Sequence, residues 1–416
     1  MMKQYSSSRV NRWSTAFPFL TIALLLAVCQ ASAQTEQKLY DFCSRPGCTD
    51  GEYPNGKLIR GAGGILAGTT TSGGAHNQGT VFWINASGVE KVLYSFCAQQ
   101  NCADGSQPFD GLIADKSGNL YGTTYLGGAH GQGTVFKITK SGTESVLYSF
   151  CGVVGCPDGA NPYAGLIMDK AGNLYGTTLG GGANNNGTVF ELSTTGSEIV
   201  LHAFQNTPDF ATPYGGLVMD TQGNVYGTTW FGGANNAGGV YEVSPDQTET
   251  RLYDQWCSLP CTQDGSSSAA TLLLGNGNLF GTSVLGGAFA HGLVFQLNIR
   301  SKKETILYSF AGIPDADGAA PFAGLINDTL GNLYGTTTGG GVSGCGGGLQ
   351  DGCGAVFKLT FSGGRWTELT LYTFANDAKD GANPFGGLII DSQRNLYGTT
   401  RLGGLNNAGT VFKIAP

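Results

Sequence analysis

Residues 111–150 read GLIADKSGNLYGTTYLGGAHGQGTVFKITKSGTESVLYSF, and the local structure of the chain can be predicted from this segment. It contains four short runs rich in residues that favour β-strands, at 111–115, 119–124, 133–138 and 145–150. The segments 115–119 and 140–144 are typical of tight hairpin turns, in which Gly supplies a positive φ. No run has the length or period of a helix. The stretch therefore predicts a four-stranded antiparallel meander.

The same unit recurs along the chain, because two markers occur seven times each. Gly-Thr-Thr or a close variant begins at Gly68, Gly122, Gly176, Gly227, Gly281, Gly335 and Gly398. A variant of Leu-Tyr-x-Phe begins at Leu39, Leu93, Leu147, Leu201, Leu252, Leu307 and Leu371. The runs are apolar on both sides, as expected for sheets that neighbours cover on both faces. A fixed period of this kind predicts sheets stacked side by side.

The two ends of the repeat array predict how it is arranged. The array opens on a fourth-type run, 38–42, and closes on a third-type run, 409–414. The seventh sheet thus lacks one strand, and the N-terminal end has one to spare. Pairing the two would remove two open edges. We predict an all-β, seven-bladed β-propeller of four-stranded antiparallel blades over residues 38–416, closed by the N-terminal strand that completes the last blade.

The connections between runs predict where variable chemistry gathers. The longest joins the fourth run of one unit to the first run of the next, and we call it the interblade connection. Because this connection must cross from the outer strand of one blade to the inner strand of the next, the first run is expected at the central channel and the fourth run at the rim. The middle connection joins the second run to the third. Because turns alternate along a meander, both connections lie on one face of the propeller, here called the loop face, where binding residues are expected.

The units resemble the GloVer tandem repeat of exported bacterial proteins. The resemblance rests on DGSQP (104–108), Asp115 to Thr124, Gly-Gly-Ala (127–129) and Gly-Thr-Val-Phe (133–136), and it covers essentially the whole mature chain. It implies a propeller, export and often a C-terminal surface anchor, and it implies no established activity. The chain reaches Pro416 without such an anchor, which favours a released or periplasmic protein. The Asp-x-x-Gly-Asn-Leu-Tyr string is also similar to repeats of some lyases and lactonases, at the level of the fold.

The N-terminal 33 residues are expected to be a signal peptide. Three basic residues precede an apolar run, 17–28, which is too short to span a bilayer, and the small residues Ala31-Ser32-Ala33 follow as a cleavage signal. Residues 34–416 would then form a single propeller domain. A lipoprotein site with Cys29 lipid-anchored is the alternative, although Val28 is larger than the residue expected there.

Charge and composition exclude several classes of protein. Gly makes up 69 of 416 residues and charged residues only 12%, which excludes a helical bundle. The mature chain would carry 19 Lys and Arg against 29 Asp and Glu, so nucleic acid is an unfavourable partner. No other apolar stretch is long enough for a membrane span. We expect a secreted or periplasmic protein.

Ten cysteines of the mature chain fall into close pairs, and an oxidising compartment favours local disulfides. Metal binding by thiolates is the alternative, but each pair supplies two ligands where a structural zinc site needs four. The predicted pairs are Cys43 with Cys48, Cys97 with Cys102, Cys151 with Cys156, Cys257 with Cys261, and Cys345 with Cys353.

Recurring Asp and Asn residues suggest a ring of oxygen ligands that could bind calcium at the channel mouth. They are Asp104, Asp158, Asp264, Asp317 and Asp380 before the first runs, and Asn184, Asn235 and Asn406 in the middle connections. A residue present in nearly every unit usually serves each unit separately, by capping a turn or accepting a left-handed φ. The pattern therefore favours a structural role over a metal site.

A binding site should break the sevenfold symmetry. The position after Gly-Thr-Thr does so, being Thr71, Tyr125, Leu179, Trp230, Val284, Thr338 and Arg401. Tyr125, Trp230 and Arg401 are residue types that supply stacking faces and anion-binding forks, so they are predicted to bind ligand. Chance variation of a surface position is the alternative.

Histidines are the second candidates. His76 and His130 occupy equivalent places in adjacent middle connections, where they could act as acid/base groups or metal ligands. His291 is shifted by one residue and His202 lies in a fourth run, so neither extends the pair.

Three functions remain open at this point. The absence of a nucleophile elbow, an H-E-x-x-H motif and a P-loop favours a non-catalytic exported propeller that binds a glycan or an extracellular protein on the loop face. The alternative is an extracellular lyase or lactone hydrolase with His76, His130 and a loop Asp at the channel mouth. A purely structural matrix component is the third.

Overall fold

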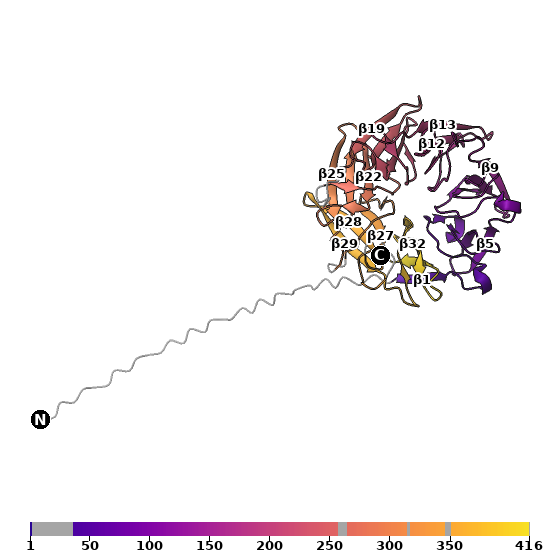
Figure 1. Cartoon of the computed structure of the whole chain (residues 1–416). Coiled ribbons are helices and arrows are strands. Elements are labelled where there is room, and N and C mark those ends of the chain that lie inside the picture. The colour runs from indigo at the N-terminus through magenta and orange to yellow at the C-terminus, as the bar shows by residue number, and fades with distance from the viewer. Residues whose placement is uncertain (2–35, 257–263, 314–316, 346–350, 416) are drawn as a thin grey trace. The chain divides into compact units, whose positions relative to one another are not determined.

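The computed structural model describes Met1 and residues 36–256, 264–313, 317–345 and 351–415. Seven four-stranded antiparallel sheets build this part of the chain, so the fold is the expected seven-bladed β-propeller. Figure 1 shows the blades following one another around a ring, from indigo to yellow. The expected signal peptide, residues 1–33, lies outside the described residues except for Met1.

The blades follow the order of the repeats, each with its innermost strand first. Blade 1 contains β2 (Ile59–Arg60), β3 (Leu66–Thr70), β4 (Thr80–Ile84) and β5 (Glu90–Ser95); blade 2 contains β6 (Ile113–Ala114), β7 (Leu120–Thr124), β8 (Thr134–Ile138) and β9 (Glu144–Ser149); blade 3 contains β10 (Ile167–Met168), β11 (Leu174–Thr178), β12 (Thr188–Leu192) and β13 (Glu198–Ala203). Blade 4 contains β15 (Val218–Met219), β16 (Val225–Thr229), β18 (Gly239–Val243) and β19 (Glu249–Asp254); blade 5 contains β21 (Leu273–Gly275), β22 (Asn278–Ser283), β24 (Leu293–Asn298) and β25 (Lys303–Ser309); blade 6 contains β26 (Ile326–Asn327), β27 (Leu333–Thr337), β28 (Ala355–Ser362) and β29 (Arg365–Thr373).

Blade 7 combines the two ends of the described propeller. It contains β31 (Ile389–Ile390), β32 (Leu396–Thr400), β34 (Thr410–Ile414) and, as its outer strand, β1 (Glu36–Asp41). The pairing of β1 with β34 runs from Glu36 opposite Ile414 to Asp41 opposite Thr410. Figure 1 shows β1 in the same blade as the yellow C-terminal strands. The first strand begins at Glu36, slightly earlier than the run at 38–42 suggested.

The Gly-Thr-Thr string explains how neighbouring blades are held together. A Cβ at Gly122 would lie 2.7 Å from the Phe136 ring, so only Gly fits under this ring. The first Thr donates a hydrogen bond to a backbone carbonyl of the next blade, as Thr123 Oγ1 does to Ala164 O at 2.9 Å. The same bond recurs at all seven boundaries, from Thr69, Thr123, Thr177, Thr228, Thr282, Thr336 and Thr399. The bond from Thr399 to Gly56 O, at 3.3 Å, joins blade 7 to blade 1.

Aromatic residues fill the space between blades. The Phe that follows an outer strand packs edge-on against the Phe of the next blade's third strand, as Phe96 does on Phe136 with ring centroids 5.0 Å apart. Both side chains are fully buried. The hydrophobic core is therefore a series of similar clusters at the blade boundaries, several of them centred on such a pair.

The innermost strands are shorter than the sequence suggested. The run at 111–115 forms only the two-residue strand β6. The residues just before it contact the preceding blade instead, where Asp110 O accepts the hydrogen bond from Thr69. The first runs thus connect blades as well as line the channel.

On the loop face, each interblade connection forms a short ladder with the middle connection of the following blade. In four blades this is one bridge, such as Glu52 with Ser72. In the other three it is a two-residue pair: β14 (Phe210–Ala211) with β17 (Phe231–Gly232), β20 (Gly265–Ser266) with β23 (Leu285–Gly286), and β30 (Gly381–Ala382) with β33 (Leu402–Gly403). Three 3₁₀ turns complete the described structure: η1 (Pro46–Cys48), η2 (Ala62–Gly64) and η3 (Gln100–Cys102). In the described part of the chain, no helix has the length and apolar character needed to cross a membrane.

Candidate binding site at the channel mouth

The central channel holds a cavity of about 930 Å³. Its wall comes from the innermost strands, with apolar side chains such as Ile59, Ile113 and Ile326. Polar groups occur where the interblade connections enter, at Asn55, Lys57 and Asp110. A concave, mostly apolar space with a few polar groups is the usual form of a ligand site.

Seven aromatic residues surround the loop-face entrance of this channel, and we call them the aromatic belt. Five follow a Pro shortly before the innermost strand of their blade, and two follow Gly-Thr-Thr: Phe109, Tyr163, Tyr214, Phe322 and Phe385, with Tyr125 and Trp230. Centroid distances between neighbouring rings are 4.7 Å for Phe109 and Tyr163, 4.3 Å for Tyr163 and Tyr214, and 4.7 Å for Phe322 and Phe385. The belt extends over blades 2, 3, 4, 6 and 7.

The predicted ligand-binding residues lie in or beside this belt. The Tyr125 ring contacts Phe109 at 5.4 Å and Tyr163 at 6.2 Å. In blade 5 the belt position holds Ala269, which has no ring. The Trp230 ring fills this gap, since its centroid lies 5.3 Å from that of Tyr214 in blade 4 and 5.7 Å from that of Phe322 in blade 6. Arg401 is exposed. Burial raises the pKa of the Tyr163 hydroxyl, and the charge of Arg401 opposes this shift, so the guanidinium lies within electrostatic reach of the belt.

Blade 1 interrupts the belt with polar residues. Asn55 takes the aromatic position there; it is 5% exposed, and its Oδ1 atom has no hydrogen-bond partner. Lys57 lines the channel, where its side chain is exposed to the space inside. Partial desolvation by the channel wall lowers the pKa of its ammonium group, and Asp110 opposes this shift. Asp110 Oδ2 accepts a hydrogen bond from Gly165 N at 2.7 Å. The mouth thus has an apolar arc and a polar sector.

Sequence reasoning missed the five belt residues before the innermost strands. A signal was present, since Pro-Phe or Pro-Tyr recurs at 108–109, 162–163, 213–214, 321–322 and 384–385. Recurrence itself concealed it, because a repeated residue suggests a structural role. Only the ring arrangement brings these side chains to one entrance.

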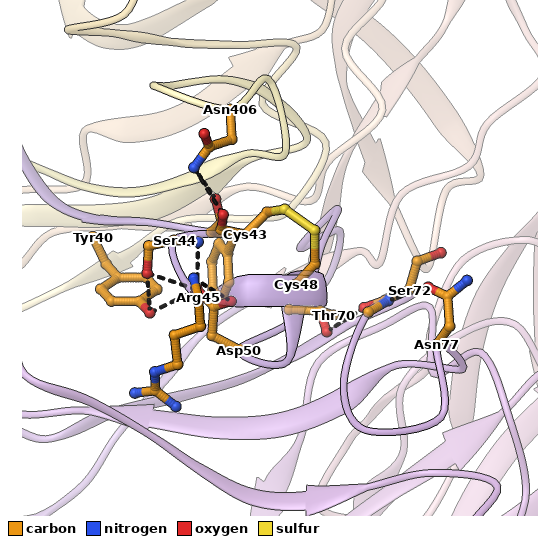
Figure 2. Close-up of a disulfide and its surroundings, with 12 residues drawn as sticks. Tyr40, Cys43, Ser44, Arg45, Cys48, Asp50, Thr70, Ser72, Asn77 and Asn406 are labelled. Atoms are coloured by element: carbon orange, nitrogen blue, oxygen red, sulfur yellow. Dashed lines mark hydrogen bonds between the residues drawn. A yellow bond between two sulfur atoms is a disulfide. The ribbon is translucent and has the colours of Figure 1, made fainter.

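The recurring Asp residues connect each interblade connection to the outer strand of the preceding blade. Figure 2 shows the example in blade 7, where Asp50 Oδ2 accepts hydrogen bonds from Tyr40 Oη at 2.8 Å and from Ser44 N at 2.9 Å. The same Tyr-to-Asp bond reaches all five predicted residues: Asp104, Asp158, Asp264, Asp317 and Asp380. None of them lines the channel cavity. Calcium at these carboxylates stays a prediction.

The predicted histidines lie away from the channel. Neither His76 nor His130 lines the cavity, and both are exposed. Their position corresponds to that of Asn406, whose Nδ2 donates to Cys43 O at 2.8 Å beside the end of an outer strand (Figure 2). Asn235 likewise donates to Gln255 O at 3.3 Å. This position therefore holds the middle connection against the interblade connection.

Four of the five predicted cysteine pairs form disulfides: Cys43–Cys48, Cys97–Cys102, Cys151–Cys156 and Cys345–Cys353. Figure 2 shows the first of them, around the short turn η1. The first three close interblade connections on the loop face.

The fifth predicted disulfide is not among the confirmed ones. Its two cysteines, Cys257 and Cys261, both lie outside the described residues, in the segment 257–263. The pairing of Cys257 with Cys261 therefore stays a prediction. The same holds for the lipid anchor at Cys29, which also lies outside the described residues.

Each outer strand also carries a Glu that packs beside the Asp of the preceding interblade connection. Burial raises the pKa of Glu144 to about 7, and the charge of Asp104 adds to the shift. Burial and Asp264 likewise raise the pKa of Glu304 to about 8. These carboxyl pairs belong to the blade boundaries and not to the channel.

Comparison with known proteins agrees with the repeat architecture. A model of the Gloeobacter/Verrucomicrobia repeat matches residues 27–167 and 155–349. No curated protein matches the chain.

Several solved structures share the fold. An extracellular domain from B. thetaiotaomicron has a TM-score of 0.54 at 9% identity, over 91% of this chain and 40% of the other. An oligogalacturonate lyase in complex with manganese has a TM-score of 0.54 at 11% identity, over 92% of this chain and 96% of the other. The oligogalacturonate lyase of Vibrio parahaemolyticus has a TM-score of 0.51 at 10% identity, over 93% and 94%. Identities this low show a common fold alone.

Proposed function

Because the chain belongs to the Gloeobacter/Verrucomicrobia repeat family, we propose that it is an exported propeller that binds a glycan at the mouth of its channel, without catalysis. The disulfides on the loop face support export, since such bonds persist in oxidising compartments. The site would be the aromatic belt with the polar sector beside it.

The observation that carries the proposal is the convergence of aromatic rings on one recess. Sugar rings present apolar C–H faces, which pack on Trp and Tyr, and hydroxyls, which need polar partners. Trp230 and Tyr125 supply the first kind of contact, and both are half-buried. Asn55, with an unpartnered Oδ1 beside the channel, supplies the second.

The cations at the mouth favour a glycan with carboxylate groups. Arg401 is exposed at the entrance, and Lys57 faces the channel. A guanidinium binds a carboxylate through two parallel hydrogen bonds, which suits a uronate. The likeness to two oligogalacturonate lyases agrees with such a ligand, but it reaches no further than the fold.

A protein partner is the second candidate, favoured by apolar side chains exposed on the loop face. Phe231 is 46% exposed, Phe289 56% and Leu405 67%. Exposed apolar side chains mark protein contacts in other molecules where they gather into a patch. The enzyme alternative has weaker support, because His76 and His130 do not line the channel.

The test is binding of the mature protein, residues 34–416, to polygalacturonate, alginate and a neutral galactan, measured by calorimetry. We expect Trp230→Ala to weaken binding of the preferred glycan about tenfold, equivalent to about 1.4 kcal/mol. Arg401→Ala should weaken the carboxylated glycans by a similar factor and leave the neutral one unchanged. Arg401 is exposed, so its replacement does not threaten folding.

A control variant lies on the opposite face. Phe361→Ala removes an aromatic ring that is 56% exposed in a hairpin of blade 6, so binding should not change. His130→Ala tests the enzyme alternative as the sequence suggested it: a binder should be unaffected, whereas glycan cleavage by wild type that this variant loses would support the enzyme. Equal binding by wild type and by both mouth variants would refute the proposal.

A further inference from the structure

The boundary between blades 3 and 4 differs from the other six. At those six, a Tyr hydroxyl of the outer strand donates to an Asp carboxylate: Tyr40 to Asp50, Tyr94 to Asp104, Tyr148 to Asp158, Tyr253 to Asp264, Tyr308 to Asp317 and Tyr372 to Asp380. At the seventh, His202 of β13 takes the place of Tyr, and its Nε2 lies 3.2 Å from Asp209 Oδ2. A metal-binding side chain thus replaces a phenol at one boundary.

A third ligand comes from the neighbouring blade. Glu249 begins β19, and its carboxylate, the His202 imidazole and the Asp209 carboxylate place one atom each within 4.8 Å of one another. We propose that His202, Asp209 and Glu249 bind a divalent transition-metal ion, with Zn²⁺ as the best fit, between blades 3 and 4. Imidazole nitrogen and carboxylate oxygen are both ligand types that Zn²⁺ accepts, and three protein ligands leave a fourth position open to water.

The surroundings prepare these groups for a metal. Asp209 is oriented by backbone hydrogen bonds from Gln205 N to Oδ2, at 2.8 Å, and from Phe210 N to Oδ1, at 2.7 Å. The His202 ring packs edge-on against Phe204, with centroids 4.8 Å apart. Supports of this kind fix the orientation of ligands around an ion. The 3.2 Å between His202 Nε2 and Asp209 Oδ2 also matches the ~3.3 Å that separates two ligands of a tetrahedral zinc site.

Glu249 has an oxygen that the protein does not satisfy. Its Oε1 is buried and has no hydrogen-bond partner, like the equivalent oxygen at five other boundaries, in Glu36, Glu90, Glu144, Glu198 and Glu304. What distinguishes this boundary is that a His belongs to the same cluster. The nearest cation on the same strand is Arg251, but its guanidinium is held by Asp254 Oδ1, at 3.4 Å, and by the Pro208 carbonyl. A buried carboxylate oxygen without a donor is costly, and a metal ion would satisfy it.

An ion can reach this place from solvent. The side chains of His202 and Asp209 are 16% and 17% exposed. The interblade connection that follows β13 contains no cysteine, whereas those that follow β1, β5 and β9 are closed by disulfides. A bound ion would link β13, this connection and β19, and so hold blade 3 to blade 4. The site is separate from the channel, since none of its three residues lines the cavity.

The experiment uses mature protein stripped with EDTA, then titrated with Zn²⁺ and followed by calorimetry, elemental analysis and melting temperature. We expect one Zn²⁺ per chain and a higher melting temperature, because a ligand that binds only the folded state stabilises it. His202→Tyr restores the residue of the other six boundaries, so the variant should fold. It should bind Zn²⁺ at least about tenfold more weakly, as should Glu249→Gln.

A reciprocal variant tests whether the geometry suffices. Tyr148→His places the same residue opposite Asp158 and Glu198 at the preceding boundary, between blades 2 and 3, and it should add a second Zn²⁺ per chain. His130→Ala, outside the cluster, should leave the stoichiometry unchanged. Wild type that binds no Zn²⁺, a His202→Tyr variant that binds it as well as wild type does, or a Tyr148→His variant that gains no ion would each overturn the assignment. None of these outcomes bears on glycan binding.

Discussion

The blade boundaries and the channel mouth are built from the same repeats but behave in opposite ways. At the boundaries, the residues repeat almost without change, as the seven Thr hydrogen bonds and the Phe pairs illustrate. At the mouth, equivalent positions hold Asn55, Phe109, Tyr163, Tyr214, Ala269, Phe322 and Phe385. The boundary must satisfy the same contacts seven times, whereas the mouth is a single site to which each blade contributes one different side chain.

In a ring of repeats, residues that stabilise the fold can therefore be distinguished from residues that bind a ligand. A boundary residue serves two adjacent blades, so the cost of replacing it is a cost in folding. A mouth residue faces a cavity that all blades share, so its replacement affects mainly what the cavity binds. Three pairs of variants test this distinction, beginning with the pair that has the largest expected effect.

The first variant compares one residue type in the two regions. Phe136 is fully buried between blades 1 and 2, whereas Phe109 is half-buried in the aromatic belt. Phe136→Ala should lower the free energy of unfolding by about 3–5 kcal/mol, because it leaves a cavity in the core. Phe109→Ala should lower it by about 1 kcal/mol. Urea unfolding measures both, and equal losses would contradict the distinction.

The second variant concerns an exception at a boundary. Tyr241 takes the place of the Phe that other blades have in the third strand, and its hydroxyl is buried without a hydrogen-bond partner. Removing an unsatisfied polar group from the core should stabilise the protein, so Tyr241→Phe should raise the free energy of unfolding by about 1 kcal/mol. A matched change at a half-buried ring of the belt, Tyr125→Phe, should have no such effect. Lower stability of Tyr241→Phe would show that the hydroxyl has a role that its contacts do not reveal.

The third variant tests the carboxyl pairs between blades and carries the smallest expected effect. Burial, with Asp264, raises the pKa of Glu304 from 4.5 to about 8. Between these values the folded protein keeps a proton that the unfolded chain releases, so stability falls as pH rises from about 4.5 to about 8. Glu304→Gln mimics the protonated acid and should reduce the drop in melting temperature between pH 5 and pH 8.

An exposed carboxylate serves as the control for this pH dependence. Asp377→Asn removes a carboxylate that is exposed to water, and the drop in melting temperature should stay as in wild type. A Glu304→Gln protein with the full wild-type drop would contradict the role of the buried pair.

The propeller and four of the disulfides could be predicted because they depend on local strings. Each Gly-Thr-Thr supplies its own strand and its own bond to the next blade, so counting the strings counts the blades. The cysteines of the four confirmed pairs lie five to eight residues apart, so a sequence pattern finds them too. The fifth pair, Cys257 with Cys261, was predicted by the same pattern but is not confirmed, because both residues lie outside the described part of the chain.

The residues of the candidate site were predicted in part, and their binding role stays a prediction. Tyr125, Trp230 and Arg401 stood out because they break the repeat, and the structure places them at one entrance. Phe322 and Phe385 could not be distinguished from structural residues by the same rule. The cluster of His202, Asp209 and Glu249 was not foreseen, because Glu249 comes from another blade and follows His202 by 47 positions in the chain.

The unit and the number of units follow from the order of amino acids, since a repeated pattern of apolar runs and glycine turns specifies how each short segment folds. Which side chains from different units meet depends on the assembled ring. Closing the ring brings one position of every blade to the same entrance. It also packs the outer strand of each blade against the interblade connection that leads into that blade. Contacts of this kind depend on the curvature of the whole ring, which no single repeat contains.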